Sequence, residues 1–128
     1  MTDLLALAVA GALGSVCRFL LSSWTYRALG EGFAYGTLLV NVIGCFALTF
    51  FMHTALVTDL VPRTLRIAVA IGFLGAFTTF STFGFETLRY LDDGDWALAA
   101  TNVLANVVLC LMASWAGLAA GRFFIGGA

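Results

Sequence analysis

The sequence predicts an all-α membrane protein: a single domain of four transmembrane helices over residues 1–128. Hydrophobic residues make up 62% of the chain and charged residues only 10%, whereas a soluble domain is about 45–50% apolar and about 25% charged. A small soluble globule has too little interior to bury this much apolar surface. Four apolar stretches joined by short connections account for the composition, because one span needs about 20 apolar residues.

The four stretches cover residues 4–26, 33–57, 64–90 and 96–124. The first follows Asp3, an acid where a signal peptide would carry a basic region, so we expect this stretch to be retained as a span. It ends at Arg27. The second is closed before Pro62, which disfavours helix at the residue preceding it. An acidic turn at residues 92–95 separates the third stretch from the fourth.

The middle of the third stretch is unusual for a membrane span. Residues 72–84 are rich in glycine, serine and threonine, where a plain span would carry leucine. These residues weaken a helix through backbone entropy and competing hydrogen bonds. Unwound backbone at membrane depth is tolerated only where it is buried in protein or lines a cavity. We therefore predict that the third helix is broken near Gly75 to Phe80, with freed carbonyls acting as ligands; the alternative is a continuous helix with a small-residue packing face.

The basic residues set little preference for one orientation in the membrane. All six are arginines, and with four spans Arg63, Arg66 and Arg122 lie on one side while Arg27 and Arg89 lie on the other. Orientation follows the excess of basic residues in short loops, so this narrow excess allows insertion both ways. We expect two oppositely inserted copies to pair as an antiparallel, dual-topology homodimer about an axis in the membrane plane. No basic patch exists to hold nucleic acid.

The residues that carry enzyme chemistry are sparse. Cys17, Cys45 and Cys110 each fall inside an apolar stretch, and their spacing matches neither a disulfide framework nor a metal site. The single histidine, His53, has no acidic partner close in sequence. We therefore expect no enzymatic activity.

Strongly polar side chains inside spans are costly and often mark function. Arg18 either attracts an anion into a water-filled vestibule or extends its guanidinium to the interface. Asn41 either donates to a ligand or joins helices. Asn102 and Asn106 lie one turn apart and form a polar stripe along the fourth stretch. Glu86 either acts as a vestibule gate or proton site or forms an ion pair with the arginine three residues later.

Three runs of the sequence match a known pattern: Gly11-Ala-Leu-Gly14-Ser-Val-Cys-Arg18-Phe, Gly36-Thr-Leu-Leu-Val-Asn41-Val-Ile-Gly44, and Gly72-Phe-Leu-Gly75-Ala-Phe-Thr78-Thr79-Phe80-Ser81-Thr82-Phe83-Gly-Phe-Glu86. With these runs the chain resembles, over essentially its whole length, the small bacterial fluoride channels of the Fluc or CrcB family. The most specific match is the run of threonine, serine and phenylalanine that is followed by a glutamate.

The resemblance implies an antiparallel, dual-topology homodimer in the plasma (inner) membrane that exports cytoplasmic fluoride passively and relieves its toxicity. It also implies one structural sodium ion at the dimer centre, held by the backbone carbonyls of Gly75 and Thr78. The implied pore residues are Asn41, Phe80, Ser81, Thr82, Phe83, Asn102 and Asn106, and the implied vestibule residues are Arg18 and Glu86. Family members often carry tyrosine or serine where this chain has the two fourth-span asparagines, so those contacts follow less directly.

The chemistry of fluoride agrees with these residue types. Fluoride is small and tightly hydrated, so a pore must replace its water with closely placed donors. Amide and hydroxyl groups donate hydrogen bonds, and the positive edge of a phenylalanine ring stabilises a bare anion. One rival interpretation is a small proton-coupled multidrug exporter, which needs an acidic residue in its first span; this chain has Arg18 there instead. A second is a non-transporting assembly or structural membrane protein, in which the asparagine and the phenylalanine and threonine positions would only pack.

Overall fold

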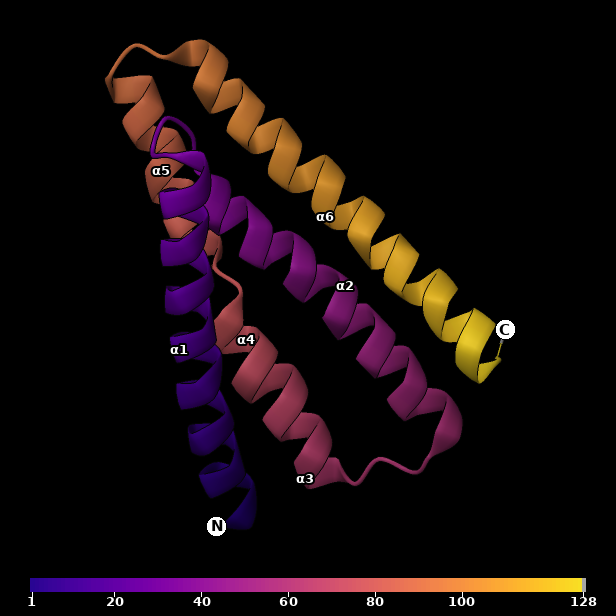
Figure 1. Cartoon of the computed structure of the whole chain (residues 1–128). Coiled ribbons are helices and arrows are strands. Elements are labelled where there is room, and N and C mark those ends of the chain that lie inside the picture. The colour runs from indigo at the N-terminus through magenta and orange to yellow at the C-terminus, as the bar shows by residue number, and fades with distance from the viewer. Residues whose placement is uncertain (128) are drawn as a thin grey trace.

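The computed structural model describes residues 1–127, and the described chain is helical, with turns between the helices and no strand (Figure 1). Four helical segments are long and apolar enough to cross a membrane: Thr2–Leu29, Tyr35–Thr58, Arg63–Asp92 and Trp96–Ile125. The prediction of an all-α chain with four apolar helices is confirmed. The first, second and fourth segments are the single helices α1, α2 and α6.

The third segment is a succession of shorter helices rather than one regular helix. In chain order they are α3 (Arg63–Arg66), η1 (Ile67–Phe73), α4 (Leu74–Phe77) and α5 (Phe80–Asp92). The η1 segment is a π-helix, a wide form that is rare in proteins and frequent near functional sites. Between α4 and α5, Thr78 and Thr79 have extended backbone, with φ/ψ angles of −85°/161° and −151°/113°.

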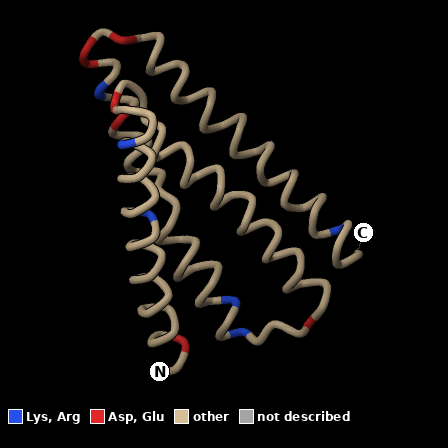
Figure 2. Tube along the Cα trace, in the orientation of Figure 1, with Lys and Arg blue, Asp and Glu red and all other residues tan. Residues whose placement is uncertain are grey.

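The helices alternate in direction, so both ends of the described chain lie at the same end of the bundle (Figure 1). The connection from α2 to α3 lies at that end as well, while the other two connections lie at the opposite end. As a result α2 and α6 run parallel to one another. Figure 2 shows most of the charged residues gathered at these two ends. Arg18 is an exception, because its position in the sequence is well inside α1.

Glycines let the helices approach one another backbone to backbone. A Cβ atom at Gly14 of α1 would lie 2.2 Å from the Phe73 carbonyl oxygen, and one at Gly117 of α6 would lie 2.4 Å from the Phe46 carbonyl oxygen. Lipid tails are as apolar as leucine, so close packing rather than hydrophobic burial holds such helices together.

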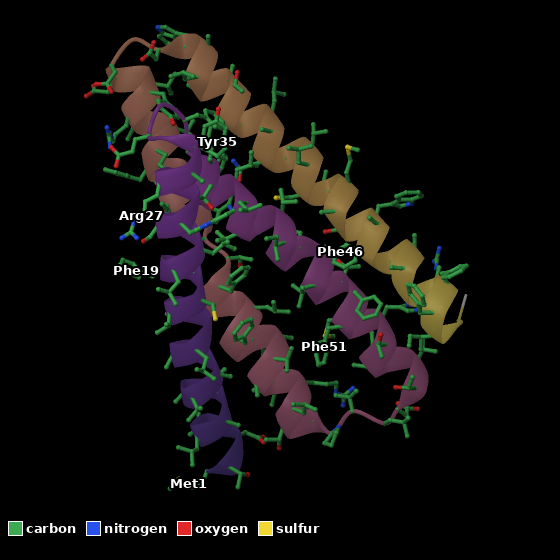
Figure 3. All side chains as sticks on the ribbon, in the orientation of Figure 1. Met1, Phe19, Arg27, Tyr35, Phe46 and Phe51 are labelled. Carbon is green, nitrogen blue, oxygen red and sulfur yellow. The ribbon has the colours of Figure 1, made fainter. Side chains whose placement is uncertain are left out.

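Polar side chains are buried in the described chain beside apolar ones such as Val40, Leu74 and Phe77, and many large apolar side chains are exposed. The buried polar side chains are Thr25, Thr37, Asn41, Thr79, Asn102 and Asn106. Large apolar side chains project from the outer faces of the helices, among them Phe19 on α1 (Figure 3). This arrangement suits a lipid environment, in which buried polar groups need partners and apolar surface needs no cover.

Candidate functional site

The extended segment between α4 and α5 is paired with a side chain from α2. The Thr79 amide donates to Asn41 Oδ1 at 2.8 Å, and Asn41 Nδ2 donates to the Thr79 carbonyl at 3.0 Å. In a continuous helix the Thr79 amide would donate to the Gly75 carbonyl. The Asn41 amide therefore replaces helical hydrogen bonds at this point and leaves the Gly75 carbonyl without its helical donor.

The Thr79 side chain caps the start of α5. Its Oγ1 accepts a hydrogen bond from the Thr82 amide at 3.2 Å, which is the usual role of a threonine at the N-cap position. The Thr79 hydroxyl also lies 2.9 Å from Thr82 Oγ1 and 3.5 Å from Ser81 Oγ. Both backbone groups and the side chain of Thr79 thus have partners, so this short extended segment is fully hydrogen-bonded within the protein.

The predicted asparagines form one chain of hydrogen bonds. Asn41 Nδ2 donates to Asn106 Oδ1 at 3.2 Å, and Asn106 Nδ2 donates to Asn102 Oδ1 at 3.1 Å. Asn102 Nδ2 then donates to the Thr87 hydroxyl at 2.9 Å. In this arrangement the amide groups join α2, α5 and α6. Their N–H groups have protein acceptors, which an incoming anion would have to replace.

Phe80 and Phe83 lie next to this amide chain at the start of α5. Their ring centroids are 5.3 Å apart and their planes are inclined at 52°. Both rings line a cavity of about 400 Å³, together with Asn41 and Asn106. Phe80 is 82% exposed, so within one chain its ring has little covering it.

Arg18 approaches the same extended segment from α1. Its Nη1 donates to the Thr78 carbonyl oxygen at 3.3 Å. The guanidinium therefore lies at the segment between α4 and α5 and is not extended to the membrane surface in this arrangement.

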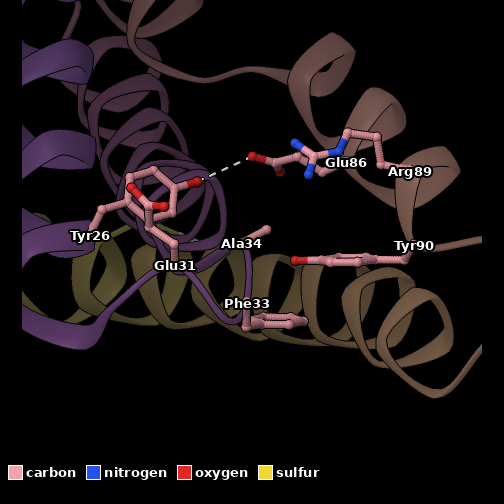
Figure 4. Close-up of a pocket in the computed structure, with 7 residues that line it drawn as sticks. All are labelled: Tyr26, Glu31, Phe33, Ala34, Glu86, Arg89 and Tyr90. Atoms are coloured by element: carbon pink, nitrogen blue, oxygen red, sulfur yellow. Dashed lines mark hydrogen bonds between the residues drawn. The ribbon is translucent and has the colours of Figure 1, made fainter. Parts of the chain in front are cut away.

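Glu86 lines a second cavity, of about 320 Å³ (Figure 4). Its Oε1 accepts hydrogen bonds from the Thr37 hydroxyl at 2.8 Å and the Tyr26 hydroxyl at 3.2 Å. Its Oε2 is buried with no hydrogen-bond partner among the described residues. The hydrogen bonds of Glu86 thus come from α1 and α2 and not from Arg89, although Arg89 lines the same cavity.

The structure brings several of the predicted residues together and separates others. Asn41, Asn106, Phe80, Phe83 and Thr78 line one cavity, whereas Glu86 lies in another. Ser81 and Thr82 are exposed.

Sequence reasoning missed Tyr26 and Thr37, which hold Glu86, and Thr87, which ends the amide chain. Thr37 lies one turn before Asn41 on α2, and that spacing was the one available signal.

Comparison with known proteins identifies the family. The family model described as "CrcB-like protein, Camphor Resistance (CrcB)" matches residues 5–118. This chain belongs to the CrcB-like family. Relatives named fluoride-specific ion channel FluC match nearly the whole CrcB-like chain. One from Geobacter metallireducens is 50% identical, covering 95% of this chain and 98% of the relative. One from Geobacter sulfurreducens is 52% identical with the same coverage, and one from Geotalea daltonii is 46% identical, covering 96% and 99%. These matches give no support to the multidrug exporter.

Proposed function

We propose that this chain is a fluoride-selective channel that lets fluoride leave the cell passively. The observation that carries the proposal is the similarity to relatives named fluoride-specific ion channels, at about half identity over nearly the whole length of both chains. With its four apolar helices, the chain is a multi-pass protein of the inner membrane.

The cavity beside the extended segment supports this function. Phe80, Phe83, Asn41 and Asn106 line one cavity. Ring edges and amide N–H groups both stabilise a dehydrated anion. An ion passing there would take N–H donors in turn from the chain of asparagines, so that each step exchanges one hydrogen bond for another. The exposed hydroxyls of Ser81 and Thr82 would add donors at the start of α5.

Two features favour an antiparallel homodimer in which the third helix is broken at mid-membrane. The extended Thr78–Thr79 segment interrupts the third span well inside its length. In a single chain one side of the cavity is open at Phe80, and a second copy would supply the missing wall. The narrow arginine excess allows that copy to be inserted the other way.

The carbonyls at the break fit a structural sodium ion. The Gly75 carbonyl lacks its helical donor because the Thr79 amide bonds to Asn41. The Thr78 carbonyl accepts one long hydrogen bond from Arg18, and a carbonyl oxygen has a second lone pair. Two such carbonyls from each of two chains would give a hard cation an all-oxygen environment. When bound, the ion would supply fixed positive charge beside the pore. Replacing sodium with an organic cation should therefore lower the thermal stability of the dimer. Equal stability in both salts would contradict the proposed sodium site.

Fluoride efflux from proteoliposomes tests the function. Vesicles loaded with potassium fluoride should release fluoride when a potassium ionophore is added, and an electrode in the external solution measures the release. Vesicles loaded with potassium chloride should release chloride far more slowly. Protein-free vesicles give the background. Efflux equal to that background, or equal rates for the two anions, would contradict the proposal. For dual topology, a single-cysteine variant at a loop position should be labelled by an impermeant thiol reagent from both faces of the membrane.

A further inference from the structure

Two of the three cysteines, Cys45 on α2 and Cys110 on α6, line the same cavity. These helices run parallel and are joined by the hydrogen bond from Asn41 Nδ2 to Asn106 Oδ1 at 3.2 Å. Cys45 lies four residues after Asn41, and Cys110 lies four residues after Asn106. Residues four apart share a helix face one turn further along. The two thiols therefore come together one turn away from the amide pair.

The side-chain arrangement agrees with this register. Both cysteines are free and partly buried. Both line the cavity that Phe80 and Phe83 border. The remaining cysteine, Cys17, is exposed on α1.

The donor set determines which cation would bind. Thiolates prefer soft cations such as Cu(I), Ag(I) and Hg(II) over hard ones. Among the described residues, no group of three or more histidine, cysteine or acidic side chains converges anywhere, so the four-ligand set of a structural zinc site is not present. A pair of thiols suits a cation that accepts two ligands.

We propose that Cys45 and Cys110 form a two-coordinate site for a soft cation. With mercuric chloride, each thiol loses a proton, two sulfur–mercury bonds form and two chloride ions leave. No oxidant or reductant is needed.

Mercury retention by the purified full-length protein tests the site. The Cys17→Ser variant leaves only the pair and serves as the parent. After mercuric chloride and a wash with a monothiol, the parent should retain about one mercury per chain, because two sulfur–mercury bonds must exchange to release it. Adding Cys45→Ser or Cys110→Ser should abolish retention. Equal retention by these single-cysteine variants, or none by the parent, would overturn the proposal.

A second measurement uses the unaltered chain. After the same mercury treatment and wash, alkylation with N-ethylmaleimide followed by peptide mass spectrometry should find Cys45 and Cys110 protected together and Cys17 modified. Modification of either member of the pair to the same extent as without mercury would overturn the proposal, even if a serine variant failed to fold.

A consequence for transport rests on the proposed function. Because the pair shares its cavity with Phe80, mercury should slow fluoride efflux in Cys17→Ser several-fold, and a dithiol should restore it. The Cys17→Ser/Cys110→Ser variant should show the same rate with and without mercury. If the chain is not a fluoride channel, the untreated Cys17→Ser parent should show no fluoride efflux but should still retain mercury. If Cys45 and Cys110 do not form the site, the parent should show normal fluoride efflux and retain no mercury.

Discussion

Asn41→Ala removes the side chain that pairs with the extended segment. The substitution deletes two hydrogen bonds with the Thr79 backbone, at 2.8 and 3.0 Å, and one with Asn106 at 3.2 Å. Thr79 is 8% exposed, so water cannot readily replace the lost partners. A buried group left unpaired costs about 1–3 kcal/mol, while side-chain hydrogen bonds in membrane proteins average about 0.6 kcal/mol. Because both the amide and the carbonyl of Thr79 lose their partner, we expect the free energy of unfolding to fall by roughly 2–6 kcal/mol.

Unfolding in mixed micelles measures this loss. The helical circular-dichroism signal is followed as sodium dodecyl sulfate is titrated into protein held in a mild detergent. Thr54→Ala is the matched control, because the Thr54 hydroxyl on α2 bonds only to a carbonyl of its own helix, at 2.9 Å. The control should change the free energy of unfolding by about 0.5 kcal/mol or less. An Asn41→Ala protein as stable as the control would refute the pairing of Asn41 with the extended Thr78–Thr79 segment.

Three further variants test the capping, the packing and the pore. Thr79→Ala removes the cap of α5 and should lower the free energy of unfolding by about 1 kcal/mol, whereas Thr79→Ser keeps the hydroxyl and should lie near wild type; equal losses would exclude the cap. Gly14→Ala places a methyl group 2.2 Å from the Phe73 carbonyl oxygen and should lower the detergent midpoint clearly. Its control, Gly84→Ala, has no neighbour within 4 Å and should be at least as stable as wild type; a similar drop in both would argue against the close contact. Phe80→Ile should slow fluoride efflux strongly while the elution volume on size exclusion stays unchanged, and an unaltered efflux rate would remove this ring from the pore.

The contacts of the candidate site depend on which helices pack together. The sequence alone leaves Asn41 as either a ligand donor or a helix contact, and its partner Thr79 lies 38 residues away. Glu86 suggested an ion pair with Arg89, yet its hydrogen bonds come from residues 49 and 60 positions away. Such partners lie on other helices, and the spacing within one helix carries no information about them.

The cysteines show the same difference. Their spacing along the chain suggested no metal site, because Cys45 and Cys110 belong to different spans. Their proximity arises from the parallel course of α2 and α6 and from the register that the Asn41–Asn106 pair defines.

The sequence alone determined that the chain belongs in a lipid membrane, how many apolar helices it has and which family it resembles. Hydropathy is a sum over residues, and a motif is read in order along the chain, so neither requires knowledge of packing. Only the tertiary structure decided which carbonyl loses its helical donor, which amide replaces that donor and which thiols meet. These are short-range contacts between distant segments, and they exist only once close helix packing has fixed the rotation and register of each helix.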